Sequence, residues 1–419
     1  DRTKVQPYWD YHFAEPEFPA DEREYVEELD RLFRQAVKRQ LVSDVELGAY
    51  LSGGMDSGSI TAVAATHLPY IKSFTCGFDL SSASGLELGF DEREKAEQMS
   101  YLFKTEHYEM VLKAGDMERI LPRLTHHLEE PRVGQSYPNF YAAQLASKFV
   151  KVVLSGAGGD ELFGGYPWRY YRAVVNDDFE DYVNKYYTYW QRLIPSEATQ
   201  KIFRPIWNDI KHVEPREIFR DVFTKHESAL ERPEDYVNHS LYFEAKTFLH
   251  GLLVVEDKLG MAHGLETRVP FLDNDLVDFA MRVPVRHKLG NLREVVRMDE
   301  NEPGPKTARY FSRTRDGKVV LRRTMQRYVP ESVVNREKQG FSGPDASWFK
   351  GESIDYVKRV LFDRRSTIFE FLDWESIAAL VQEHLEAKEN RRLLIWSLLN
   401  IEQWCHTFLA VEVPISSAN

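Results

Sequence analysis

Two patterns of apolar positions alternate along the first part of the chain. Between residues 21 and 40, apolar side chains recur every three or four positions, which predicts an amphipathic helix. Short apolar runs follow, and stretches with helical spacing separate them. The predicted strands cover 47–51, 71–76, 105–110 and 151–154. Strands that alternate with helices predict a doubly wound α/β fold, in which a parallel sheet is covered on both faces.

The pattern changes beyond about residue 166, where apolar strands largely vanish and aromatic-rich helical spacing dominates. Helices are predicted at 182–193, at 240–250 and, at the end, over 393–408, whereas the polar stretch near 301–317 is typical of a loop. We therefore expect three segments. They are an irregular arm at 1–20, an α/β core at 21–170 and a mainly helical region at 171–419.

Composition and charge exclude several classes of protein. The 419 residues are 43% hydrophobic, and no apolar run approaches the ~18–20 residues of a membrane-spanning helix. The net charge of −12 argues against a protein that coats nucleic acid. Two cysteines are too few for a disulfide framework or a cysteine zinc site, and together with the absence of a signal-peptide pattern they favour the cytoplasm.

A glycine turn follows the first predicted strand directly and leads into a helix. Its sequence is Ser52-Gly53-Gly54-Met55-Asp56-Ser57. Two glycines let the backbone N–H groups turn inward, and the helix start adds free N–H groups, so the turn is suited to bind a phosphate. Asp56 would repel an anion unless a divalent cation lies between them. The alternative is an ordinary strand-to-helix turn capped by serine.

A second glycine turn follows the fourth predicted strand in the same way. It reads Ser155-Gly156-Ala157-Gly158-Gly159-Asp160-Glu161 and continues to Gly164-Gly165-Tyr166. If the fourth strand lies beside the first, both turns open onto the crevice where the strand order reverses, and Asp56 and Asp160 meet at one Mg²⁺. Neither turn fits the familiar nucleotide signatures, because the P-loop lysine and the third glycine of the dinucleotide pattern are missing.

These turns and two later blocks resemble the synthetase domain of the glutamine-dependent asparagine synthetase family. The matching segments are 52–57, with the pyrophosphate-loop sequence, 155–166, 256–273 and the lysine motif at 335–341. The resemblance spans about residues 8 to 408. It implies an adenine nucleotide alpha hydrolase-like fold that binds ATP and Mg²⁺. It also implies a two-step reaction in which a carboxylate, most simply the aspartate side chain, is adenylated and ammonia then displaces AMP.

The resemblance also assigns roles to single residues. It implies that the first turn holds pyrophosphate and that Asp56 and Asp160 hold Mg²⁺. Lys338 would neutralise the phosphates during adenylation, although a solvated surface lysine is the plain alternative. The residues implied at pyrophosphate are Ser52, Gly53, Gly54, Asp56 and Ser57, and those implied to line ATP are Tyr50, Cys76, Ser155 and Gly156.

The third block offers weaker candidates for the acceptor. Asp257, Lys258, Glu266 and Arg268 either contact the acceptor carboxylate or form structural ion pairs around a packed helix, and the sequence leaves both open. His263 is expected to be a packed core or interface histidine.

Two departures from the family pattern matter. The chain begins at Asp1, without the glutaminase domain that usually precedes the synthetase domain in this family. We expect that this domain was removed, that it is a separate subunit, or that free ammonia is used. The second departure is Ala157, where glutamate is common; Glu161 or Glu256 could substitute, or the acceptor is not aspartate.

The leading hypothesis is thus an AMP-forming amide ligase, most simply an asparagine synthetase. Alternatives are an amidotransferase or cyclase that acts on another carboxylate, and a non-catalytic nucleotide-binding subunit, which Ala157 would favour. A nucleic-acid-modifying enzyme is disfavoured by the negative charge, and assembly as a homo-oligomer stays open.

Overall fold

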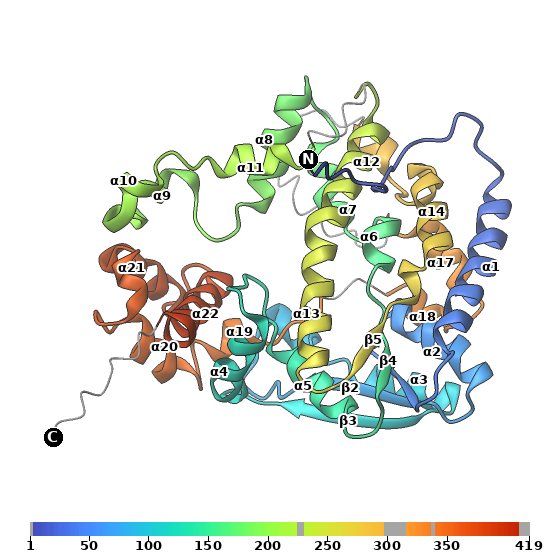
Figure 1. The fold of residues 1–419 in the computed structure, drawn as a ribbon, viewed down its shortest axis with the longest axis horizontal. Coiled ribbons are helices and arrows are strands. Elements are labelled where there is room, and N and C mark those ends of the chain that lie inside the picture. Colours follow the sequence, from blue (N-terminus) through green and yellow to red (C-terminus); the bar gives the residue numbers. More distant parts are fainter. Residues whose placement is uncertain (1–2, 224–229, 297–315, 337–339, 410–419) are drawn as a thin grey trace.

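A five-stranded parallel sheet forms the base of the structure (Figure 1). The computed structural model describes residues 3–223, 230–296, 316–336 and 340–409. The strand order is β3-β2-β1-β4-β5, so the chain first winds outward from β1 in one direction and then in the other. The strands are β1 (Leu47–Tyr50), β2 (Lys72–Phe78), β3 (Glu106–Leu112), β4 (Val152–Leu154) and β5 (Glu266–Arg268). The predicted doubly wound fold is confirmed, and the order reverses between β1 and β4.

Helices cover both faces of this sheet. On one face, Ala49 of β1 and Leu154 of β4 belong to a core with Ile60 of α2. On the other face, Val153 packs with Ala146 of α5. The apolar residues of β1 and β4 are therefore packed on both faces of the sheet, whereas most residues of β3 are exposed or half-buried. The helices before β4 are α1 (Glu22–Gln40), α2 (Met55–His67), α3 (Arg93–Phe103), α4 (Asp116–Leu128) and α5 (Tyr137–Ala146).

The strand β5 was not expected from the sequence. It pairs in parallel with β4, with Val152 opposite Glu266 and Leu154 opposite Arg268. Its three residues, Glu-Thr-Arg, are polar and carry no strand pattern. The buried N–H and C=O groups on the edge of β4 that faces away from β1 need hydrogen-bond partners, and the backbone of β5 supplies them.

Beyond β4, the described residues are helical apart from β5 and irregular connections. The α-helices are α6 (Gly159–Phe163), α7 (Pro167–Tyr170), α8 (Phe179–Trp190), α9 (Thr199–Ile202), α10 (Trp207–Ile210), α11 (Pro215–Asp221), α12 (Pro233–Glu244), α13 (His250–Met261), α14 (Asn274–Arg282), α15 (Leu292–Val296), α17 (Val319–Met325), α18 (Glu331–Val334), α19 (Asp345–Trp348), α20 (Ile354–Leu361), α21 (Trp374–Leu385) and α22 (Arg392–Phe408). A π-helical turn, η5 (Ala245–Leu249), joins α12 to α13, so the helix predicted at 240–250 is part of a much longer one. Short 3₁₀ turns are η1 (Gly85–Gly89), η2 (Tyr171–Ala173), η3 (Ser196–Ala198), η4 (Arg204–Ile206), η6 (Pro270–Leu272), η7 (Val285–His287) and η9 (Thr367–Glu370).

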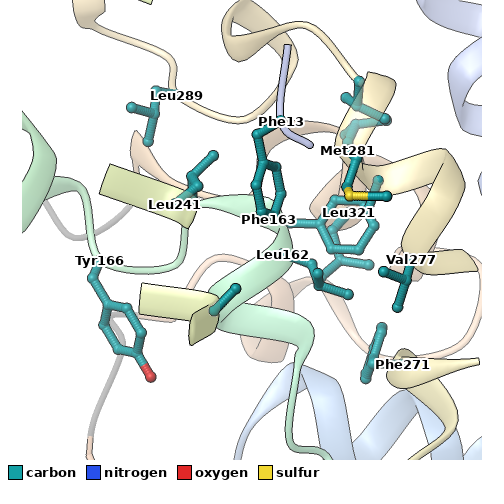
Figure 2. Packing of buried hydrophobic residues seen from close by; sticks show 14 of the residues in the cluster. Phe13, Leu162, Phe163, Tyr166, Leu241, Phe271, Val277, Met281, Leu289 and Leu321 are labelled. Carbon is teal, nitrogen blue, oxygen red and sulfur yellow. The ribbon is translucent and has the colours of Figure 1, made fainter. Parts of the chain in front are cut away.

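Segments from all three predicted parts meet in one core. Phe13 of the arm packs with Phe163 of α6, Met281 of α14 and Leu321 of α17 (Figure 2). The helix α17 also contacts α1 and α2, next to the sheet. The division at residues 20 and 170 stays a prediction, but the later segment contributes side chains to the core of the earlier one. None of the helices in the described ranges is long and apolar enough to cross a bilayer.

Candidate active site

A cavity of about 530 Å³ opens at the carboxyl ends of β1 and β4, where the strand order reverses. This is the place where doubly wound sheets bind ligands. Most of the residues singled out in the sequence line it. They are Tyr50, Ser52, Gly54, Asp56, Ser57, Cys76, Ser155, Gly156, Asp160, Glu161 and Glu256.

The first glycine turn is held in shape by its two serines. The Ser57 hydroxyl accepts a hydrogen bond from the backbone N–H of Ser52 (3.0 Å) and lies 2.9 Å from the Ser52 hydroxyl. Ser52 in turn accepts from the N–H of Gly54 (3.1 Å). Gly54 is the N-cap of α2 and has no side chain with which to cap it. The N–H groups of the first turn of α2 therefore remain available to an anion.

The two glycine turns converge. A Cβ atom added to Gly156 would lie 3.1 Å from the backbone N of Ser57 and 3.3 Å from the Cβ of Asp56. A Cβ atom added to Gly159 would lie 3.0 Å from the carboxyl carbon of Asp56. The second turn thus needs glycine because the first turn packs directly against it. This contact brings the carboxylates of Asp56 and Asp160 to one place, as the strand order predicted.

Lys318 lies between these two carboxylates. Its Nζ atom is 2.5 Å from Oδ2 of Asp56 and 2.6 Å from Oδ1 of Asp160, and its side chain is only 7% exposed. Lys318 is the N-cap of α17 and has a left-handed backbone with φ of 58°. The preceding Gly317 leaves no room for a side chain, because a Cβ there would lie 2.3 Å from the carbonyl oxygen of Gly164. Sequence reasoning missed Lys318, since nothing in its local pattern marks it.

A second cation lies over the first turn. The Arg336 guanidinium donates to the carbonyl of Gly53 (3.1 Å) and pairs with Glu92 (2.8 Å). Burial and the charge of Arg336 lower the pKa of the neighbouring Lys95. Arg336 belongs to the predicted lysine motif. Lys338, the lysine of that motif, lies outside the described residues.

Cys76 and Tyr50 line the cavity beside the first turn. Burial raises the pKa of the Cys76 thiol to about 12, and burial also raises the pKa of the Tyr50 phenol. Both side chains are therefore neutral near pH 7. Cys76 is therefore unsuited to act as a thiolate nucleophile, and its role beside a nucleotide stays a prediction.

The comparison with known proteins identifies the family. The family model described as asparagine synthase matches residues 28–406, which is most of the chain. This chain belongs to the asparagine synthase family. Glutamine-hydrolyzing asparagine synthetase 1 of Bacillus subtilis is 27% identical over 411 residues, which cover 92% of this chain and 60% of that protein. A putative glutamine-hydrolyzing asparagine synthetase of Mycobacterium bovis is 28% identical over 425 residues, covering 92% of this chain and 58% of that protein.

The chain thus spans about three fifths of the length of these relatives. Among solved structures, an NH3-dependent NAD synthetase from Campylobacter jejuni covers 55% of this chain at 12% identity, with a TM-score of 0.25. That likeness is too distant to support any conclusion about function.

Two carboxylates, Glu161 and Glu256, lie near Ala157 of the second glycine turn. Glu161 is 2% exposed and closes its own turn, because it accepts from the N–H of Gly158 (3.1 Å) and from the hydroxyl of Tyr166 (2.9 Å). Glu256 of α13 accepts a hydrogen bond from the Ser155 hydroxyl (2.9 Å) through Oε1. Burial raises the pKa of Glu256 to about 7, and the charge of Glu161 adds to this rise.

The other residues of the third block lie elsewhere. Lys258 donates to the carbonyl of Leu128 (2.7 Å) and pairs with Glu129 (2.8 Å). Arg268 pairs with Glu266 (2.7 Å) and also donates to the backbone carbonyls of Gln40 and Val42 at the end of α1. Lys258, Arg268 and the exposed Asp257 are not among the cavity-lining residues. These contacts favour the structural ion-pair interpretation.

The His263 ring packs edge-to-face on Phe140, with 4.4 Å between the ring centroids. The sequence predicted a packed histidine at this position, and this contact is of that kind.

Arginines line the cavity wall formed by the helical region. Arg169, which is buried, pairs with Glu244 (2.9 Å) and lies over the ring of Tyr166. Burial lowers the pKa of Arg192, and the nearby charges of Arg169 and Arg392 lower it further. Arg169, Arg192 and Arg392 all line the cavity. The sequence offered no sign of this cluster, because its members are separated by up to 223 positions in regions without a motif.

The carboxylates of the site suit a magnesium ion that is also bound by phosphates. Within the described ranges, no group of three or more histidine, cysteine, aspartate or glutamate residues is placed to hold a metal. Mg²⁺ in nucleotide sites is commonly held by one or two carboxylates together with substrate phosphates. Asp56 and Asp160 supply such a pair, and Oδ1 of Asp56 is buried without a hydrogen-bond partner among the described residues.

Proposed function

We propose that this chain is the synthetase part of an ATP-dependent, AMP-forming amide ligase that converts aspartate to asparagine. A side-chain carboxylate oxygen attacks the α-phosphorus of ATP, and pyrophosphate leaves. Ammonia then attacks the acyl carbon, and AMP leaves. The observation that carries the proposal is the convergence of two glycine turns on one cavity, with Asp56 and Asp160 side by side, in a chain of the asparagine synthase family.

The cavity supplies what adenylation needs. Charge grows on the phosphate oxygens during the reaction, so N–H donors and cations fixed in advance stabilise the transition state. The first turn of α2 offers the donors, and Lys318 and Arg336 offer positive charge at either side of the turn. Asp56 and Asp160 would hold Mg²⁺, which supplies further charge neutralisation when it is bound. Lys338 is proposed to reach the phosphates as well.

The acceptor is proposed to be aspartate and the nitrogen source ammonia. The arginine-lined wall suits a substrate with a second carboxylate, as aspartate has, because guanidinium groups bind carboxylates in a fixed geometry. A glutaminase domain or subunit would supply the ammonia, in line with the names of the relatives. The cytoplasmic location remains part of the proposal and rests on the two cysteines, both of them buried and free.

The proposal is tested by exchange of labelled pyrophosphate into ATP in the presence of Mg²⁺. Aspartate-dependent exchange is expected for the wild type, and a fall of about a hundredfold or more is expected for Asp56→Asn and for Asp160→Asn. Asp209→Asn, at an exposed position of α10, is the matched control and should exchange normally. Exchange only with another carboxylate would replace aspartate as the acceptor. No exchange with any carboxylate would contradict the ligase itself.

A further inference from the structure

One carboxylate in the cavity retains an unused oxygen. Oε1 of Glu256 accepts from the Ser155 hydroxyl at 2.9 Å, whereas Oε2 is buried and has no hydrogen-bond partner among the described residues. A buried carboxylate oxygen without a donor is costly, and such atoms call for an explanation in a native structure. The phosphate-binding machinery does not use this oxygen. It therefore remains available to accept a proton or a hydrogen bond from a ligand in the cavity.

The position of Glu256 connects it to the second glycine turn. The Ser155 hydroxyl that donates to Glu256 also accepts from the backbone N–H of Ala157, at 3.4 Å. The Glu256 carboxylate is therefore one hydroxyl group away from the backbone of the second turn at Ala157. Figure 1 shows α13, which carries Glu256, running down to the sheet beside β4 and β5. Packing of α13 on the sheet thus brings a carboxylate from a different element to the same turn.

The competing carboxylate is already occupied. Both oxygens of Glu161 accept hydrogen bonds, one from Gly158 and one from Tyr166, and these bonds fix the start of α6. Glu161 would have to give up one of them to take a proton from a substrate. Glu256 keeps its bond to Ser155 and can use the other oxygen.

We propose that Glu256 is the catalytic base of the second half-reaction and receives the proton of the attacking ammonia at Oε2. This inference rests on the proposed function. The nitrogen lone pair forms the C–N bond to the acyl carbon, Oε2 takes one N–H proton, and the C–O bond to AMP breaks with its electron pair leaving on the phosphate. Ser155 holds the carboxylate in place through Oε1.

The electrostatic surroundings fit this task. The ionisable groups that face Glu256 are Glu161 of α6 and the phenol of Tyr50 at the end of β1. Burial and the negative charge of Glu161 favour the protonated form of Glu256, with a pKa of about 7. A base whose pKa lies near the working pH is ionised in a large fraction of molecules and still binds a proton effectively.

The test compares Glu256→Gln with the wild type in three assays of the same preparation. Pyrophosphate exchange with aspartate should stay within a few-fold of the wild type, because adenylation precedes nitrogen attack. Amide formation from ammonia should fall about a hundredfold or more, the usual contribution of a general base. Hydroxamate formation from hydroxylamine should fall much less, since hydroxylamine is largely unprotonated near neutral pH and loses its proton more readily after attack.

Each outcome has a definite meaning. Amide formation near the wild-type rate, equal losses with both nucleophiles, or exchange that falls together with amide formation would each overturn the role of Glu256. Glu118→Gln on α4, whose carboxylate pairs with Arg359 and does not line the cavity, should behave as the wild type in all three assays. A wild type that exchanges with no carboxylate overturns the proposed function itself, and with it the inference. If only the proposed role of Glu256 is wrong, the wild type still exchanges pyrophosphate, so the two results can be told apart.

Discussion

Asp56 and Asp160 lie at the starts of two different helices, α2 and α6, and share the ammonium group of one lysine. Lys318 Nζ is 2.5 Å from one carboxylate and 2.6 Å from the other, and the three side chains are 7–14% exposed. Two carboxylates this close and this buried repel each other, so a cation between them is required. In the described structure Lys318 supplies that positive charge.

Lys318→Met is expected to destabilise the protein at neutral pH. The substitution keeps the length of the side chain but leaves two buried carboxylates without their cation, which typically costs about 3 kcal/mol of unfolding free energy. Urea unfolding at pH 7, with and without Mg²⁺, measures this loss. Mg²⁺ should restore more stability to the variant than it adds to the wild type. A loss below about 0.5 kcal/mol, the range of ordinary surface substitutions, would show that Lys318 does not hold the pair together.

Gly165→Ala is expected to displace Asp160. A Cβ at this position would lie 2.0 Å from Oδ1 and 2.7 Å from Cα of Asp160, so either the side chain or the backbone of the second turn must move. Overpacking of this kind costs about 1–3 kcal/mol. Exchange of pyrophosphate should fall at least about tenfold, which corresponds to ~1.4 kcal/mol. Gly290→Ala is the matched control, because its Cβ would meet its nearest atom, the carbonyl oxygen of Asp316, at an ordinary 3.6 Å. Normal exchange by Gly165→Ala would contradict the tight fit.

Lys288→Met is expected to stabilise the protein. The lysine is fully buried, its Nζ has no hydrogen-bond partner among the described residues, and it lies 4.9 Å from the centre of the Phe13 ring. Burial lowers its pKa from 10.5 to about 7, and the charge of Glu15 only partly opposes this. Replacing it should raise the unfolding free energy by about 4 kcal/mol at pH 7, since each pKa unit corresponds to ~1.36 kcal/mol.

The pH dependence provides the check on Lys288. The pKa of Lys288 is lower in the folded protein than in the unfolded chain, so between pH 7 and 10.5 the unfolded chain binds more protons. The contribution of Lys288 to the free energy of unfolding of the wild type therefore rises with pH across this range. The advantage of Lys288→Met should therefore shrink as the pH rises through it. Unfolding curves at several pH values measure the difference, with the exposed Lys388→Met as control. A difference that does not change with pH would mean that the ammonium is not desolvated.

Lys338→Ala is expected to slow adenylation without a large effect on stability. The residue stands in the lysine motif beside Gly340 and Phe341, both of which line the cavity. Loss of a cation that stabilises the phosphates in the transition state should cost ~3 kcal/mol, about a hundredfold in the exchange rate. Lys388→Ala, at an exposed position paired with Glu386, controls for a general loss of charge. An unchanged exchange rate would remove Lys338 from the mechanism.

The elements that the sequence predicted are those with a strong local pattern. The runs predicted at 47–51 and 151–154 became β1 and β4, which are apolar because they are covered on both faces. Those predicted at 71–76 and 105–110 became β2 and β3, which also carry polar residues. The two glycine turns could be located because a tight anion-binding turn restricts the residue types at consecutive positions. The polar strand β5 and the interrupted helix from α12 to α13 could not be predicted, since neighbouring elements impose them.

The sequence by itself determined the alternation of strands and helices and the two glycine turns with their aspartates, because each depends on residues close together in the chain. The order of the strands, which places β4 beside β1 and brings the two turns together, came from the tertiary structure. Only the tertiary structure decided which other side chains reach that site. Lys318 meets Asp56 from 262 positions away, and Glu256 meets Ser155 from 101 positions away. The packing of α17 and α13 against the core fixes these contacts. Such packing depends on the shape and burial of many side chains together, and no local pattern records it.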